Sequence, residues 1–166
     1  MGNTVETPGS DRKPASDRNP GPDLRIRNAL TIDVEDYYHV TGYARSIDPR
    51  GWDTYESRVN ASTQKLLDIL ARRNVHATFF VLGWVAERNP ELIRAIHAAG
   101  HEIAYHSYWH RLVYDQTPEE FRADLRHGRA LLEDMIGAPI SGYRAPSFSI
   151  TEKSLWALEI LAEEGF

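Results

Sequence analysis

The spacing of apolar positions along the chain changes repeatedly, and these changes predict strands that alternate with helices. Short runs rich in β-branched or aromatic residues, typical of strands, lie at residues 28–34, 75–82, 101–105 and 140–144. Apolar residues recur every three or four positions, as in amphipathic helices, over residues 59–74, 90–99, 118–136 and 149–164. Such alternation indicates parallel βαβ units, so we expect an α/β fold.

Residues at the predicted helix ends support this division of the chain. Thr117 and Glu120 have the spacing of a capping box, in which each side chain accepts a hydrogen bond from the other residue's backbone amide. Pro90 suits a first helical position, where no amide hydrogen is needed. Gly100 and Gly137 follow two of the helices, where glycine readily adopts the left-handed backbone of a helix end.

The first part of the chain has a different composition. Residues 1–24 are rich in proline, glycine and polar residues, and we expect a disordered tail there, with the folded domain at residues 25–166. The most apolar stretch, residues 77–86, has about half the length that a membrane crossing requires. No apolar leader is visible at the N-terminus, so the expected location is cytoplasmic.

Charge and cysteine content narrow the classes of function. The net charge is -5, which disfavours a nucleic-acid partner because phosphate backbones require a basic surface. The chain has no cysteine, which excludes disulfides and thiolate metal sites. Any metal must therefore be held by histidine, aspartate or glutamate.

Two groups of potential metal ligands follow predicted strands. Asp33, Glu35 and Asp36 cluster after the first strand, where an α/β fold commonly places its active site. His106 and His110, in the sequence HSYWH, follow the third strand and can converge on one ion. Exposed polar loops would explain either group alone. Together they predict an open site with two imidazoles and one carboxylate.

A third group follows the fourth predicted strand. Arg144 could pair with an active-site carboxylate and hold it ionised and oriented. Pro146 would stiffen the next turn and could direct the amide of Ser147 toward a developing oxyanion. Trp109, beside the histidines, is one of several aromatic residues that could stack on a sugar ring, although core packing is the commoner use of such residues.

Taken in order, the segments TIDVED, ATFFVLGW, GHEIAYHSYWH and GYRAPSFS resemble the polysaccharide deacetylases of the NodB-homology type, carbohydrate esterase family four. DVEDYY and RAPSF resemble most the subgroup associated with exosortase-linked exopolysaccharide clusters. The resemblance covers residues 28–166 and implies an α/β fold, a distorted (β/α)7 barrel. It implies an incomplete barrel, C-terminally truncated, because the family's later motifs, including a leucine-histidine motif, have no counterpart here.

The resemblance also implies roles for individual residues. Asp33 matches the catalytic base, and Arg144 matches the arginine that orients it. His106 and His110 match the metal-binding histidines. The family's second aspartate is replaced by a valine, so the carboxylate ligand is either Asp36, our first choice, or Glu35. The expected cofactor is a divalent metal, with zinc favoured over cobalt, nickel or manganese.

The expected function is therefore metal-dependent hydrolysis of N-acetyl groups on an N-acetylated polysaccharide substrate, as in exopolysaccharide modification, impaired here by truncation. One alternative is a hydrolase of small non-peptide amides on the same fold. A non-catalytic carbohydrate-binding fragment is another. A phosphotransfer enzyme is the least favoured, because it leaves HSYWH unexplained and needs a glycine-rich phosphate loop.

Overall fold

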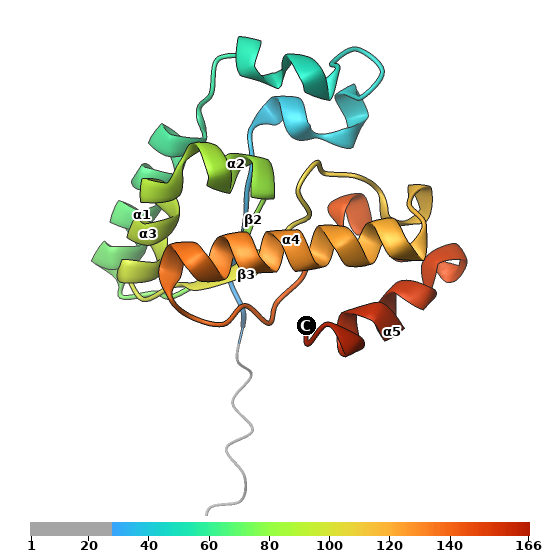
Figure 1. The fold of residues 1–166 in the computed structure, drawn as a ribbon. Coiled ribbons are helices and arrows are strands. Elements are labelled where there is room, and N and C mark those ends of the chain that lie inside the picture. The colour runs from blue at the N-terminus through green and yellow to red at the C-terminus, as the bar shows by residue number, and fades with distance from the viewer. Residues whose placement is uncertain (1–27) are drawn as a thin grey trace, which may run out of the picture.

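A short sheet of three parallel strands lies at the centre of the computed structural model, which describes residues 28–166 (Figure 1). The strands are β1 (Thr31–Val34), β2 (Thr78–Val81) and β3 (Glu102–Tyr105), and they pair in sequence order. Val34 pairs with Val81, and Val81 pairs with Tyr105, so the three strands end level with one another. The residues that follow the strands therefore emerge at one edge of the sheet.

Helices connect the strands as the apolar spacing predicts. Helix α1 (Val59–Arg73) links β1 to β2, while α2 (Gly83–Arg88) and α3 (Pro90–Ala98) link β2 to β3. Helix α4 (Pro118–Ile136) crosses in front of the sheet, and α5 (Trp156–Glu163) packs against α4 (Figure 1). None of the helices within residues 28–166 combines the length and apolar composition needed to cross a membrane.

The core lies between the sheet and these helices. Its fully buried side chains come from β2, β3, α3 and α4, and they include Phe79, Val81, Ile93, Ile96, Tyr105, Phe121, Leu125 and Leu132. Burial of each large apolar side chain contributes about 1.5–3 kcal/mol relative to an exposed position. Because β3 and α4 both contribute to this core, the end of β3 is held firmly against the helix.

The ends of α4 are those that the sequence predicts. The hydroxyl of Thr117 accepts a hydrogen bond from the amide of Glu120, and the Glu120 carboxylate accepts one from the amide of Thr117. Gly137 ends the helix with a left-handed φ of 68°. The capping box and the glycine stop are therefore confirmed, and they fix where α4 lies relative to the sheet.

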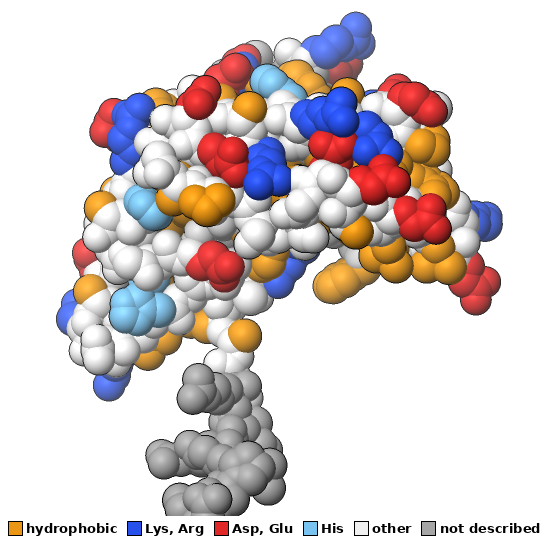
Figure 2. Space-filling model, turned by 60° about the horizontal axis from the view of Figure 1, so that its bottom comes forward, with side chains coloured by type: hydrophobic (Ala, Val, Ile, Leu, Met, Phe, Trp, Pro, Cys, Tyr) orange, Lys and Arg blue, Asp and Glu red, His pale blue; other side chains and the backbone are white. Residues whose placement is uncertain are grey.

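Ion pairs connect α4 to α5 on the surface. Arg122 pairs with Glu163 and Glu164, and Arg126 also pairs with Glu164 at 2.8 Å. Figure 2 shows acidic and basic side chains beside one another on this face. Such exposed pairs typically contribute at most about 1 kcal/mol each, so they orient α5 more than they stabilise it.

The connection between β1 and α1 has a structure that apolar spacing does not predict. It contains three short 3-10 helices: η2 (Tyr37–His39), η3 (Thr41–Tyr43) and η4 (Pro49–Thr54). Tyr38, His39 and Trp52 are buried there and pack edge-on against one another and against Trp84 of α2. This aromatic cluster holds the connection above the carboxyl ends of the strands.

Two local predictions are corrected by the structure. Residues 140–144 do not form a strand, because Tyr143 makes a single parallel bridge to Tyr105 and Pro146, which has no amide hydrogen, starts a 3-10 turn soon after. The helix predicted over residues 149–164 is shorter, because residues 152–154 form a 3-10 turn and α5 begins at Trp156. The predicted disordered tail at residues 1–24 lies outside the described residues.

Candidate metal centre and reaction cavity

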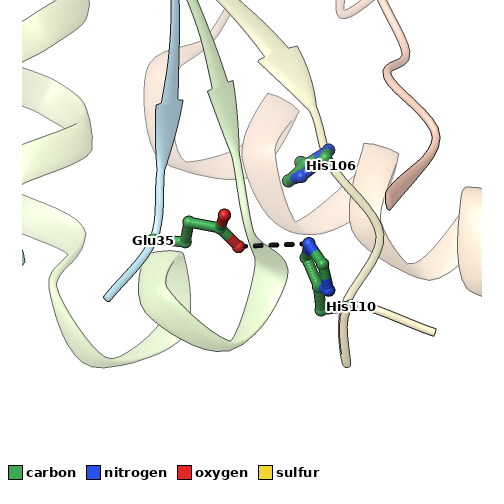
Figure 3. Close-up of side chains that lie close together, drawn as sticks. All are labelled: Glu35, His106 and His110. Atoms are coloured by element: carbon green, nitrogen blue, oxygen red, sulfur yellow. Dashed lines mark ion pairs between the residues drawn. The ribbon is translucent and has the colours of Figure 1, made fainter. Parts of the chain in front are cut away.

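The level ends of β1 and β3 bring three potential metal ligands together. Glu35 follows β1, and His106 and His110 follow β3 (Figure 3). One ligand atom from each residue lies within 4.8 Å of the others. The two histidines are buried, with exposed fractions of 2% and 8%, so a small ion between these residues would be largely enclosed by protein.

Hydrogen bonds orient the two imidazole rings. Nδ1 of His106 donates to the carbonyl oxygen of Arg144 at 2.8 Å, which leaves the lone pair of Nε2 free to bind a metal. Nδ1 of His110 lies 3.3 Å from the hydroxyl of Thr41, and its Nε2 lies 3.3 Å from Oε2 of Glu35. Both rings can therefore present Nε2 to a common point.

Burial disfavours charge on all three side chains. It raises the pKa of Glu35 to about 7, with a further contribution from the negative charge of Asp33. Burial lowers the pKa of His110 to about 4, and the neighbouring His106 adds to this shift. The pKa of His106 is also lowered by burial. Between these pKa values, both Glu35 and His110 are neutral, so their close approach is not a stable ion pair.

This electrostatic arrangement fits a divalent cation. Oε2 of Glu35 is buried and has no hydrogen-bond partner in the part of the chain that the structure describes. A buried polar atom without a partner is costly, whereas a cation would stabilise an ionised carboxylate and accept both imidazole lone pairs. Two imidazoles and one carboxylate form the open ligand set of many catalytic zinc sites.

Asp36 lies outside this cluster, and the expectation that it would join the histidines is corrected. Its carboxylate accepts hydrogen bonds from the hydroxyl of Ser57 at 2.7 Å, the amide of Arg58 at 2.8 Å and the hydroxyl of Tyr38 at 3.2 Å. These three donors hold the side chain toward the start of α1. The carboxylate that reaches the histidines is that of Glu35, the alternative in the sequence-based prediction.

Arg144 meets Asp33 as the sequence predicts. Its Nη1 donates to Oδ1 of Asp33 at 2.6 Å, and its Nη2 donates to the hydroxyl of Thr31 at 2.8 Å. The guanidinium group also lies over the ring of Phe80, 4.0 Å from its centre. These contacts fix the direction of both Arg144 and the Asp33 carboxylate.

Asp33 and the three potential ligands face one cavity of about 160 Å³. Ser147, whose hydroxyl lies 2.9 Å from that of Thr41, also lines it. Its backbone is left-handed, with a φ of 49°, and Phe148 beside it is 91% exposed. Pro146, between Ala145 and Ser147 of the lining, is itself buried. The cavity therefore places the Asp33 carboxylate, a potential metal centre and a tight turn next to one another.

Trp109 lies beside this cavity and not in its wall. It lines an adjoining pocket of about 320 Å³, together with Trp52, Val40 and His110. Val40 and His110 line both the pocket and the cavity, so the two spaces adjoin one another. The indole of Trp109 is 43% exposed and available to a ligand.

Thr41 is a contact that the sequence does not predict. Its hydroxyl lies near both His110 and Ser147, although the three residues are far apart in sequence. Thr41 belongs to the connection built from 3-10 helices, where no periodic spacing or motif identifies it.

A family profile described as polysaccharide deacetylase matches residues 49–163. The chain belongs to the polysaccharide deacetylase family. The match includes His106, His110 and Arg144, whereas Asp33 and Glu35 lie before its first residue. The structure brings Asp33 and Glu35 to the same cavity as these three residues.

Curated relatives of this chain agree with the family. A peptidoglycan-N-acetylglucosamine deacetylase of Bacillus cereus is 36% identical over 98 residues, which are 58% of this chain and 36% of that protein. A chitooligosaccharide deacetylase of Bradyrhizobium is 35% identical over 101 residues, which are 60% of this chain and 43% of that protein. The chain therefore spans less than half the length of these two relatives.

Solved structures confirm the fold class. A crystal structure from Mycobacterium smegmatis, assigned as a polysaccharide deacetylase, is 34% identical with a TM-score of 0.67, covering 83% of this chain and 48% of that one. A family pseudoenzyme from Bacillus anthracis is 22% identical with a TM-score of 0.63, covering 81% and 39%, and it supports the fold alone. The α/β architecture is thus part of a NodB-type barrel. The exosortase-associated subgroup and the C-terminal truncation stay predictions.

Proposed function

We propose that Glu35, His106 and His110 hold one divalent cation, and that this site hydrolyses N-acetyl groups on a polysaccharide. The observation that carries the proposal is the convergence of two buried imidazoles and the half-buried Glu35 carboxylate beside the Asp33–Arg144 pair. A bound cation would polarise the acetamide carbonyl and lower the pKa of a water molecule. Zinc suits this ligand set best, with cobalt, nickel or manganese as alternatives.

Asp33 is the proposed general base. Its carboxylate lines the cavity and is held by Arg144, which in turn is held by the hydroxyl of Thr31. A water molecule between Asp33 and the acetamide would lose its proton to the carboxylate as its oxygen attacks the carbonyl carbon. As the carbon–nitrogen bond breaks, the leaving nitrogen takes up the proton that Asp33 accepted, and the products are acetic acid, which ionises to acetate, and the free sugar amine.

The turn at Pro146 and Ser147 is the proposed support for the developing oxyanion. Ser147 lines the cavity with a left-handed backbone, a conformation that costs energy in a residue other than glycine. Such local cost is common where a backbone amide must point at a reacting group. Pro146, itself buried, limits how far the turn can move.

The pocket beside Trp109 is the proposed place for a neighbouring sugar unit of the polymer. An exposed indole offers an apolar face to a sugar ring, and the pocket adjoins the reaction cavity through Val40 and His110. The relatives named for peptidoglycan N-acetylglucosamine and for chitooligosaccharides favour a polymer that contains N-acetylglucosamine. Modification of an exopolysaccharide is the proposed biological use.

Two alternatives have less support. A purely carbohydrate-binding fragment would not need two buried histidines and a glutamate directed at one point, and burying Oε2 of Glu35 without a partner is unfavourable. A small-amide hydrolase would use the same centre, but it leaves the pocket beside Trp109 without a function.

Acetate release from N-acetylglucosamine oligomers tests the proposal. Acetate release should be slow but measurable after loading with zinc and absent after chelation. Asp33→Asn should lower the rate about 10²- to 10⁴-fold, the usual contribution of a general base, while zinc affinity stays within a few-fold of wild type. Acetate release that resists both chelation and Asp33→Asn would refute the mechanism. Faster release from small acetamides than from oligomers would favour the small-amide alternative.

A further inference from the structure

The loop that carries both histidines has an unfavourable backbone. Ser107 and His110 have left-handed φ values of 61° and 52°. Such values are uncommon outside glycine, asparagine and aspartate, and they persist only where the surrounding structure imposes them. The loop between His106 and His110 therefore needs contacts that hold it in place.

One set of contacts comes from the start of α2. The amide of Gly83 donates to the carbonyl oxygen of Ser107 at 2.9 Å, and the amide of Trp84 donates to that of Tyr108 at 3.2 Å. A side-chain carbon on Gly83 would lie 2.7 Å from the Tyr108 ring, so the glycine is needed for this approach. These bonds fix the carbonyl groups of Ser107 and Tyr108, whereas the amide of Tyr108 needs another partner.

That amide is held by Asp124 of α4, a residue with no part in the proposed reaction. The amide of Tyr108 donates to Oδ1 of Asp124 at 3.0 Å. Oδ2 of the same carboxylate is buried and has no hydrogen-bond partner among residues 28–166. A buried, half-satisfied carboxylate is an expensive way to join a helix to a loop, and an apolar residue would serve packing better.

We propose that Asp124 is a positioning residue, which fixes the loop through the Tyr108 amide so that His106 and His110 both point at Glu35. Tyr108 is midway in sequence between the two histidines, so a contact at its amide constrains both rings together. Helix α4 is itself anchored against β3 by the core, which gives the carboxylate a fixed origin. The role rests on the proposed metal centre, whereas the hydrogen bond itself does not.

Two substitutions of similar size separate this role from packing. Asp124→Asn keeps a carbonyl oxygen that can accept from the Tyr108 amide. Asp124→Leu fills the same space and removes the acceptor. Asp134→Ala, on the exposed side of α4, is the matched control. Zinc affinity, measured by competition with a chelating dye, should fall about 10- to 100-fold in Asp124→Leu, the usual effect of losing a group that orients a ligand. It should stay within about threefold of wild type in Asp124→Asn and the control.

Hydrogen exchange of the Tyr108 amide in the metal-free protein tests the contact without the metal. Exchange should be faster in Asp124→Leu than in Asp124→Asn. If Asp124→Leu does not fold, Asp124→Ser, too short to reach the amide, replaces it. Equal zinc affinity in wild type and Asp124→Leu overturns the positioning role, as does an equal loss in Asp124→Asn and Asp124→Leu. If wild type binds no metal yet Asp124→Leu exchanges faster, the proposed metal centre fails while the contact stands.

Discussion

Replacing Glu35 by glutamine should weaken metal binding without weakening the fold. The substitution preserves the size of the side chain and removes its charge. Groups that only orient metal ligands contribute about 10- to 100-fold to affinity, so loss of a direct carboxylate ligand should lower zinc affinity by at least about 100-fold. Glu35 is the carboxylate that shares the cluster with His106 and His110 among the described residues.

In the metal-free protein, the same Glu35→Gln substitution should raise the stability of the fold at high pH. The pKa of Glu35 rises from 4.5 to about 7 in the folded state. The folded protein thus holds this proton more tightly than the unfolded chain, and stability falls as pH rises from about 4.5 to 7. At 1.36 kcal/mol per pKa unit, ionised Glu35 costs on the order of 3 kcal/mol above that range. Glu35→Gln should recover up to that amount at pH 8 and little at pH 4.

Asp36→Asn is the control, because we expect it to lower the stability of the fold while zinc affinity changes little. The Asp36 carboxylate accepts three hydrogen bonds away from the histidines, and hydrogen bonds to a charged group contribute about 1.5–3 kcal/mol each. The variant should lose about 2–3 kcal/mol of unfolding free energy, because asparagine can keep part of this network. Its zinc affinity should remain within about tenfold of wild type.

Competition titrations with zinc and urea denaturation in the presence of a chelator, at pH 5 and pH 8, measure both quantities. The assignment of the carboxylate ligand is refuted if Asp36→Asn loses zinc and Glu35→Gln retains it. The electrostatic reasoning is refuted if metal-free Glu35→Gln is less stable than wild type at pH 8.

Three further predictions follow from other residues. Arg144→Ala should lower kcat for acetate release about 100-fold, because Asp33 loses its fixed direction, and an unchanged kcat would contradict this. Burial lowers the pKa of His39 to about 4. The neutral His39 side chain therefore contributes up to roughly 3 kcal/mol to folding stability above pH 6.5, and this contribution is lost as pH falls toward 4. In urea denaturation, His39→Gln should therefore lose less stability than wild type between pH 7 and 4.5. Gly128→Ala should destabilise by about 3 kcal/mol or more, because the added carbon would lie 1.9 Å from a core tyrosine ring. Gly42→Ala, which meets nothing within 4 Å, should change thermal stability little.

The three strands and most of the helices could be predicted from sequence, because they follow from short-range patterns. The pairing of Asp33 with Arg144 was implied by the family resemblance. Strand and helix spacing places the carboxyl ends of parallel strands at one edge, and a motif at each end supplies the side chains. The choice between Glu35 and Asp36 could not be made in this way. It depends on Ser57 and Arg58, which hold Asp36 from more than twenty positions away.

The connection at residues 37–57 was also beyond sequence reasoning. Its 3-10 helices follow no apolar period, and they are held by aromatic contacts to Trp84 on another helix. Thr41, which contacts the site, is visible only once this connection is placed. Residues 140–144 have the composition of a strand, but they meet β3 at a single bridge between Tyr143 and Tyr105, and a 3-10 turn begins soon after at Pro146.

The pairing of Arg144 with Asp33 joins segments 111 positions apart, and this has a consequence for biosynthesis. During translation, Glu35 leaves the ribosome long before His106, His110 and Arg144. A nascent chain that ends between them holds the carboxylate of the proposed centre and neither of its two imidazoles, so it has little means of capturing an ion there. Loading of the centre is therefore a late event, which must wait until the segment after β3 has emerged and folded onto the sheet.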